Sequence, residues 1–318
     1  MSALAISTTR KSGKKRNLAA VLLLAVILVS SFIVFESIHL STQPQTITVS
    51  HDELIDYALS LINLDRQENG LQNVTLSTIN SGQQHADDML KNGYFSHWDL
   101  QGYKPYVRYT LAGGKGAVTE NVGLIENWLA AGITQKQALN QSEWSMVHED
   151  ADWNWGHKQN ILNPLHNYVS IGIASDHDRL YFVEDFEDNY ISWTQLQINK
   201  TQAYLEGTIQ TTQQNNIQQI AVFYDNAKPL TTLQLQETPY NGSYNPGAYV
   251  GSVLPPNWQA TQGITITADS WYQTGNHFRF SFSLAKAIEA NCEGIYTLYI
   301  ETGSSTENAL TSYSFVVQ

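Results

Sequence analysis

The sequence predicts an α+β domain followed by an all-β domain, behind an apolar segment near the N-terminus. Apolar residues recur at helical spacing between Asp52 and His148. Two short apolar runs, Tyr168–Ala174 and Leu180–Phe186, have the length and residue types of strands. Beyond Trp193 apolar and polar residues alternate, which is typical of strands in a half-buried sheet. The 318 residues are enough for two separate cores.

Helices and a short sheet are expected in the first domain, which we place at residues 51–193. Its first helix should begin at Asp52 and end at Gly70, because glycine suits the position after a helix. Further helices are expected over Ser77–Asn92 and Thr134–His148. Helices followed by a pair of strands should stack as layers.

Short strands dominate the second domain, which we place at residues 194–318. The segments ITITA, FRFSFSL, IYTLYIE and SYSFVVQ alternate with period two and are separated by clusters of Gly, Asn and Pro, such as Tyr240–Gly247. Six or seven short strands in about 120 residues suggest a sandwich of immunoglobulin-like size. No catalytic cluster stands out in this domain.

The N-terminal segment has the features of a membrane anchor. Residues 18–35 are an uncharged run long enough to cross a hydrocarbon core of about 30 Å as a helix. Five basic residues lie in the preceding tail, residues 1–17, which places the N-terminus in the cytoplasm. Residues 36–50 form a linker. A cleavable signal peptide is the alternative, but no small-x-small site follows the run, so we expect a single-pass anchor with extracellular domains.

Charge and cysteine content exclude several classes of protein. Five of the 17 basic residues precede the apolar run, which leaves 12 basic against 29 acidic residues after it, a net charge of −17. So acidic a surface repels phosphate backbones, and nucleic acid is not expected as a partner. The single Cys292 excludes an internal disulfide framework.

Four short motifs in the first domain carry the chemistry. They are HADDM (85–89), NGYFSH (92–97), TENVG (119–123) and WGHKQNILNP (155–164). In this order they resemble the cysteine-poor bacterial and archaeal branch of the CAP superfamily (cysteine-rich secretory protein, antigen 5 and pathogenesis-related 1; also called SCP/PR-1-like). Four motifs in order are more specific than any one of them. The resemblance implies an α-β-α sandwich whose cleft holds two histidines and one or two acidic residues.

The resemblance also assigns residues to this cleft. It implies that His97 and His157 are ligands of Zn²⁺ or another divalent cation, because neutral imidazoles coordinate such ions. Glu120 would accept a proton or a hydrogen bond from a bound water and is the candidate general base of any hydrolysis. Asn121 and Trp98, which adjoin these motif residues, are expected to line the cleft.

The motifs depart from the family pattern at several positions. The frequent GEN is TEN here, with Thr119, and GHR is GHK, so Lys158 keeps the charge but not the bidentate contact of an arginine. The second acidic residue of many eukaryotic members has no direct counterpart. Glu149 is the candidate, although Asp150 and Asp152 are equally near in sequence.

Other residues near the motifs have simpler explanations. His85 lies at helical phase with Met89 and is expected to pack within the fold rather than bind metal. Four tryptophans are expected either to pack in the core or to form an aromatic wall for a ligand. They are Trp98, Trp144, Trp153 and Trp155.

Three functions are compatible with these residues. The first is a cell-surface binding module that captures a hydrophobic or glycan ligand, together with a divalent metal. The second is a metal-dependent hydrolase, such as a peptidase, in the same cleft. It is less favoured because catalytic zinc sites have a third protein ligand, and no motif supplies one. The third is a structural or adhesion protein. The sequence therefore favours binding over catalysis.

Overall fold

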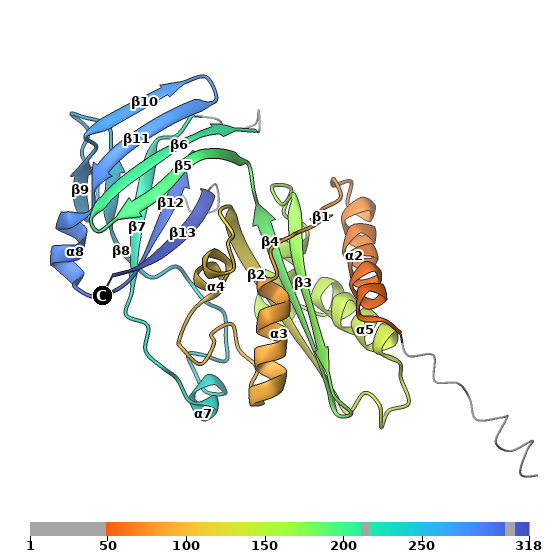
Figure 1. Cartoon of the computed structure of the whole chain (residues 1–318). Coiled ribbons are helices and arrows are strands. Elements are labelled where there is room, and N and C mark those ends of the chain that lie inside the picture. The colour runs from red at the N-terminus through yellow and green to blue at the C-terminus, as the bar shows by residue number, and fades with distance from the viewer. Residues whose placement is uncertain (1–48, 211–215, 303–308, 318) are drawn as a thin grey trace, which may run out of the picture. The chain divides into compact units, whose positions relative to one another are not determined.

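The structure is a computed structural model of the whole chain, and it describes residues 49–210, 216–302 and 309–317 (Figure 1). The expected basic tail, the expected anchor and nearly all of the expected linker lie outside these residues. In the described ranges no helix is both long and apolar enough to cross a membrane. The chain from Ser50 onward forms one compact unit.

The first domain combines helices with a sheet, as expected, but this sheet has four strands rather than the expected pair. In chain order its elements are α2 (His51–Glu68), β1 (Thr75–Leu76), α3 (Ser81–Asn92), α4 (Pro105–Leu111), β2 (Ala117–Glu126), α5 (Gln135–His148), the 3₁₀ turn η1 (Ala151–Trp153), α6 (Gly156–Ile161), β3 (Tyr168–Ser175) and β4 (Arg179–Asp188). The three long helices and the strands β3 and β4 agree with the predictions to within a few residues. The TEN motif, residues 119–121, lies within strand β2.

Capping residues explain where α2 and α5 begin and where α3 ends. The hydroxyl of Ser50 accepts a hydrogen bond from Glu53 N at 3.2 Å and caps α2. Thr134 and Gln137 form a reciprocal capping box at the start of α5. Helix α3 ends at Gly93, whose φ of 71° lies in the left-handed region that glycine adopts without strain.

Helices cover both faces of this sheet (Figure 1). The strand order is β1-β3-β4-β2, so β2 is an edge strand that pairs only with β4, in antiparallel register from Ala117↔Asp188 to Glu126↔Arg179. Helices α2 and α5 pack against each other and against one face. Helix α3 packs on β3 and β4 from the opposite face. The edge of β2 is therefore left for other parts of the chain to cover.

The second domain is a two-sheet β structure. Its elements are β5 (Ile191–Asn199), β6 (Gln202–Ile209), β7 (Gln219–Asp225), α7 (Thr232–Leu235), β8 (Ala248–Leu254), β9 (Ile264–Thr267), β10 (Ser270–Thr274), β11 (His277–Ser283), α8 (Ala285–Asn291), β12 (Gly294–Glu301) and β13 (Ala309–Val317). The sheets have the orders β10-β11-β6-β5 and β13-β12-β7-β8-β9. Buried residues of both sheets, such as Phe280 and Leu298, share one core. The immunoglobulin-like classification stays a prediction, and Trp193, the expected boundary, lies within β5.

A long connection of the second domain packs against the first. Residues 226–247, between β7 and β8, include α7. Leu230 N donates to the carbonyl of Leu100 at 2.8 Å, and Leu235 is buried in the same apolar cluster as Trp98. The two domains therefore share buried surface, and this connection reaches the region where the motifs lie.

Candidate functional site

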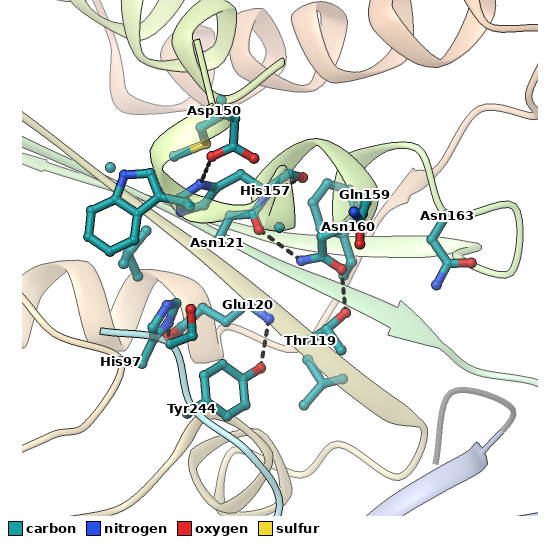
Figure 2. Close-up of a pocket in the computed structure, with 18 of the residues that line it drawn as sticks. His97, Thr119, Glu120, Asn121, Asp150, His157, Gln159, Asn160, Asn163 and Tyr244 are labelled. Carbon is teal, nitrogen blue, oxygen red and sulfur yellow. Dashed lines mark hydrogen bonds and ion pairs between the residues drawn. The ribbon is translucent and has the colours of Figure 1, made fainter. Parts of the chain in front are cut away.

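A cleft of about 1140 Å³ runs along β2 (Figure 2). Its walls come from the loop before Trp98, from β2, from α5 and α6, and from the second domain. Five residues that the sequence placed in the cleft line it. They are His97, Glu120, Asn121, Glu149 and His157.

His97 and Glu120 form the first polar centre of the cleft, together with Arg108 of α4. His97 Nδ1 lies 2.8 Å from Glu120 Oε1, and Arg108 donates to Glu120 Oε2 at 2.5 Å. Arg108 also donates to the carbonyl of His97 at 2.6 Å. The Glu120 side chain is fully buried, so the guanidinium supplies the charge that a buried carboxylate needs. Both carboxylate oxygens of Glu120 are engaged, which disfavours its use as a general base.

Burial sets the protonation of this centre. Burial, together with the nearby Arg108 guanidinium, lowers the pKa of His97 to about 3. Burial also acts to lower the pKa of Arg108, but Glu120 and two further carboxyl groups outweigh it and raise this pKa. His97 is therefore neutral and donates from Nδ1 to Glu120. Its Nε2 makes no hydrogen bond within the described part of the chain.

The low pKa of His97 predicts that acid destabilises the fold. An unfolded histidine, with a pKa of 6.5, binds a proton between pH 6.5 and about 3 that the folded protein does not bind. Stability should fall as the pH decreases through this window, by up to about 1.4 kcal/mol per pH unit from His97. Urea denaturation between pH 4 and 7 should give a shallower slope for His97→Gln than for the wild type. The exposed His51→Gln variant is the control, and equal slopes in all three proteins would contradict the assignment.

His157 forms a second centre with Asp150. His157 Nδ1 lies 2.6 Å from Asp150 Oδ1, and Asp150 Oδ2 accepts a hydrogen bond from Lys158 N at 3.1 Å. Asp150 is only 1% exposed. Glu149, the candidate chosen from the sequence, lines the cleft as the exposed C-cap of α5, but it is Asp150 that pairs with the histidine. The one-residue difference arises because the chain turns sharply at the end of α5.

A network of amides and hydroxyls lies beside His157. Asn121 Nδ2 donates to Glu184 Oε2 at 3.0 Å, and Asn160 Nδ2 donates to Asn121 Oδ1 at 3.0 Å. Thr119, which stands where the family pattern frequently has glycine, donates from Oγ1 to Asn160 Oδ1 at 2.6 Å. His166 Nε2 lies 2.9 Å from the same oxygen. These contacts fix the orientation of several polar groups that face the cleft.

Three carboxyl groups close to the two centres are buried. Burial and the neighbouring Glu184 raise the pKa of Glu143 well above its ordinary value, and burial raises the pKa of Glu184. The same effect raises the pKa of Asp185, which accepts a hydrogen bond from Ser81. Raised pKa values favour the neutral carboxyl form, so these buried acids add little negative charge near the cleft.

The two centres lie on opposite sides of β2. Glu120 and Asn121 are neighbours on a strand, so their side chains project to opposite faces of the sheet. Figure 2 shows Glu120 with His97 and Tyr244 on one side, and Asn121 with His157 and Asp150 on the other. In the described ranges no group of three or more His, Cys, Asp or Glu side chains could hold a metal ion. The expected set of two histidines and a glutamate is therefore divided into two histidine–carboxylate pairs.

Trp98 lies in the apolar core and not in the cleft, where it was predicted. Its side chain is 8% exposed and does not line the cleft. Tyr240 and Tyr244 of the second domain pack edge-on against its ring, with centroids at 5.4 and 6.5 Å, and enclose it. The expected aromatic wall is supplied instead by Trp153, which is 50% exposed and lines the cleft.

His85 packs in the fold, as the helical phase predicts. It is 1% exposed, and its Nε2 lies 2.8 Å from the carbonyl of Ser96. Burial lowers the pKa of His85 well below its ordinary value, so the ring is neutral. It lies behind Glu120, with Nε2 4.0 Å from Glu120 Oε1.

Arg108 and Tyr244 contact the first centre but were not predicted as site residues from the sequence. The only sequence signal for Arg108 is a single charge within an otherwise uncharged helix, PYVRYTL. Tyr244 accepts a hydrogen bond from Glu120 N at 3.0 Å, and its ring centroid lies 4.9 Å from that of His97. It lies within a cluster of turn-forming residues in the other domain, so no local pattern connects it to the cleft.

A family model identifies the first domain. Residues 59–186 match the model described as CAP, cysteine-rich secretory protein family. This part of the chain is a CAP domain. The match confirms the resemblance drawn from the four motifs, and it covers all the residues of the two histidine centres. The search of curated proteins gave no significant match.

Three solved structures of bacterial proteins are similar to part of this chain. An extracellular protein containing an SCP domain from Bacillus anthracis is 19% identical, with a TM-score of 0.32 over 43% of this chain and 43% of that chain. An outer surface protein from Borrelia burgdorferi is 15% identical, with a TM-score of 0.34 over 44% and 96% of the respective chains. The CAP domain of enterococcal PrgA is 15% identical, with a TM-score of 0.30 over 43% and 62%. The chain thus spans less than half the length of the first of these proteins.

Proposed function

We propose that this protein is a membrane-anchored, extracytoplasmic binding protein whose CAP cleft captures an elongated ligand. The observation that carries the proposal is that the carboxylates of Glu120 and Asp150 are both held by neighbouring donors. Glu120 is held by His97 and Arg108, and Asp150 by His157 and the Lys158 amide. Pairing of this kind orients groups for recognition and leaves neither Glu120 nor Asp150 with a free carboxylate oxygen to activate water. The acidic net charge makes nucleic acid an unsuitable ligand in this proposal.

The lining of the cleft favours a ligand with polar groups. From the sequence we expect a hydrophobic or a glycan ligand. The hydrogen-bonded Thr119 and Asn160 present polar atoms, while Trp153 offers an exposed aromatic surface beside them. Sites for sterols or acyl chains are mainly apolar with few polar groups. A glycan, or another chain with polar groups at regular spacing, therefore fits this lining better than a sterol.

A divalent cation would find two protein ligands in this cleft. His97 and His157 each use Nδ1 for a carboxylate, as metal-binding histidines commonly do, and each keeps Nε2. Because the two nitrogens lie on opposite sides of β2, Zn²⁺ or another divalent ion would be held at one of the two centres and would polarise a ligand oxygen there. Stable zinc sites have three or four protein ligands, so we expect any such binding to be weak.

Binding assays test the proposal. The full-length protein would be titrated with β-linked tetrasaccharides, with a soluble sterol derivative and with unstructured heptapeptides, and bound and released products would be followed by mass spectrometry. We expect one class to be retained unchanged. Release of cleaved products would support the hydrolase instead, and retention of no class would support an adhesion role.

Replacing Trp153 with alanine should weaken that binding about tenfold, because an aromatic contact contributes about 0.5–1.5 kcal/mol beyond its buried area. The fold should be unaffected, since half of the ring is exposed. Trp258→Ala is the matched control, because Trp258 is 61% exposed and does not line the cleft. Calorimetric titration of both variants measures the difference. Equal affinities would remove Trp153 from the binding surface.

A further inference from the structure

The edge of β2 has a defined pattern of outward-facing backbone groups. In an antiparallel pair, alternate residues direct their N–H and C=O groups toward the partner strand and away from it. Glu120 N donates to Tyr244 and Val118 N donates to Ser312 Oγ at 3.3 Å, so the even-numbered residues face away from β4. Asn127 N bonds to the carbonyl of Asp178, next to β4, which agrees with this parity.

The second domain covers the first part of this edge. Ser312 of β13 accepts from Val118 N and donates its own N–H to the carbonyl of Gly116 at 3.1 Å. Tyr244 then accepts from Glu120 N. Ser312 and Tyr244 thus occupy three successive outward-facing positions of this edge, at Gly116 just before β2 and at Val118 and Glu120 within it.

The rest of the edge is uncovered and lies in the cleft. Val122 and Leu124 are the next outward-facing residues, and their backbone groups on this side have no hydrogen-bond partner among the residues that the structure describes. Both line the cleft, as do their neighbours Gly123 and Ile125. An unpaired strand edge is a template for another extended chain, and proteins normally cover it.

We propose that the ligand of this cleft is an extended polypeptide segment that adds to β2 as a further strand. The inference rests on the proposed function, namely that the cleft is a binding site. The outward-facing groups of Val122 and Leu124 repeat about every 6.8 Å, which is the repeat of an antiparallel strand. Main-chain hydrogen bonds of this kind are the basis of peptide recognition by strand addition.

The surroundings of the edge suit an extended peptide. Side chains of an added strand would point alternately to the two faces of the sheet, as those of β2 do. On one face they would meet His97, and on the other His157. Trp153, whose ring centroid lies 6.1 Å from that of His157, lines the same cleft beside it. Tyr244 closes one end, so the peptide would begin pairing immediately after Glu120. Each imidazole keeps one ring nitrogen for a side chain or carbonyl of the peptide.

The test uses peptides whose backbone, rather than the protein, is altered. Heptapeptides would be selected from a random display library on the immobilised full-length protein and then synthesised with N-methyl groups at alternate residues. We expect methylation of one alternating set to weaken binding more than tenfold and methylation of the other set to change it less than threefold. Only one set of peptide N–H groups faces β2 in strand addition.

Two variants at one position provide the control in the protein. Leu124→Pro removes an outward-facing N–H that does not bond to β4, and proline is tolerated on edge strands. We expect this variant to lose peptide binding more than tenfold, and to lose at least several-fold more than Leu124→Ala, which removes the same side chain but keeps the N–H.

Other outcomes overturn the inference. If both methylated sets bind equally, the peptide does not add as a strand. If no peptide is enriched while a tetrasaccharide binds, the inference falls and the proposed function stands. If neither class binds, both fall. Should the proline variant not fold, the methylated peptides still decide the question.

Discussion

Replacing Arg108 with methionine should lower the free energy of unfolding by about 3–5 kcal/mol, the range for breaking a buried ion pair by removal of one partner. The Glu120 side chain is fully buried, and Arg108 is the cation that contacts it. Without the guanidinium, the carboxylate must stay charged in a poorly solvated position or take up a proton. The carbonyls of His97 and Tyr103 also lose their donor. Urea denaturation at pH 7 measures the change.

A second substitution separates the charge effect from the loss of packing. Glu120→Gln in the Arg108→Met background removes the unpaired carboxylate, so the double variant should regain much of the lost stability. The coupling energy of this double-mutant cycle then reports the ion pair itself. A loss of less than about 1 kcal/mol in Arg108→Met, or simple additivity in the cycle, would show that Glu120 does not depend on Arg108.

The helices and strands of the CAP domain were predictable because their residues lie close together in the chain. Apolar spacing located α2, α5, β3 and β4, and Gly93 marked the end of α3. The motifs predicted that His97 and His157 line one cleft, because they do so in the family that the motifs resemble. Local apolar spacing was therefore enough to predict the helices and strands, and the order of the motifs was enough to predict which histidines line the cleft.

The partners within the site could not be predicted, since they depend on tertiary contacts. His157 contacts Asp150 rather than Glu149. Both residues follow the last turn of α5, where helical spacing no longer predicts the direction of a side chain. Tyr244 is 124 residues from Glu120, and its segment has the composition of a turn. The edge position of β2 follows from strand order, which no single segment encodes.

Residues of both domains line the cleft, so its shape depends on how the two domains pack together. The second domain supplies Ser312 and Tyr244 to the edge of β2 and thereby sets which part of the edge is uncovered. Arg108 fixes Glu120 and His97 from the CAP side. A CAP domain without its β-sheet neighbour would expose a longer strand edge, and with it a larger surface for unspecific pairing.

Replacing Gly172 with alanine should destabilise the protein by about 3–5 kcal/mol, a large effect even for overpacking of a core. A Cβ at this position of β3 would lie 2.1 Å from the carbonyl oxygen of Gly82 and 2.7 Å from Gln83 N. These are backbone atoms of α3, so relief requires the whole helix to move away from the sheet. Urea denaturation measures the loss.

A shift of α3 would also reach the site, because this helix carries His85 behind Glu120 and ends just before the loop that holds His97. Gly156→Ala is the matched control: a Cβ there meets no atom within 4 Å, and Gly156 is the first residue of α6, beside His157. This variant should be neutral or more stable by up to about 1 kcal/mol, since alanine favours the helix. Equal stabilities of the two variants would mean that α3 does not approach β3 as closely as the two glycines indicate.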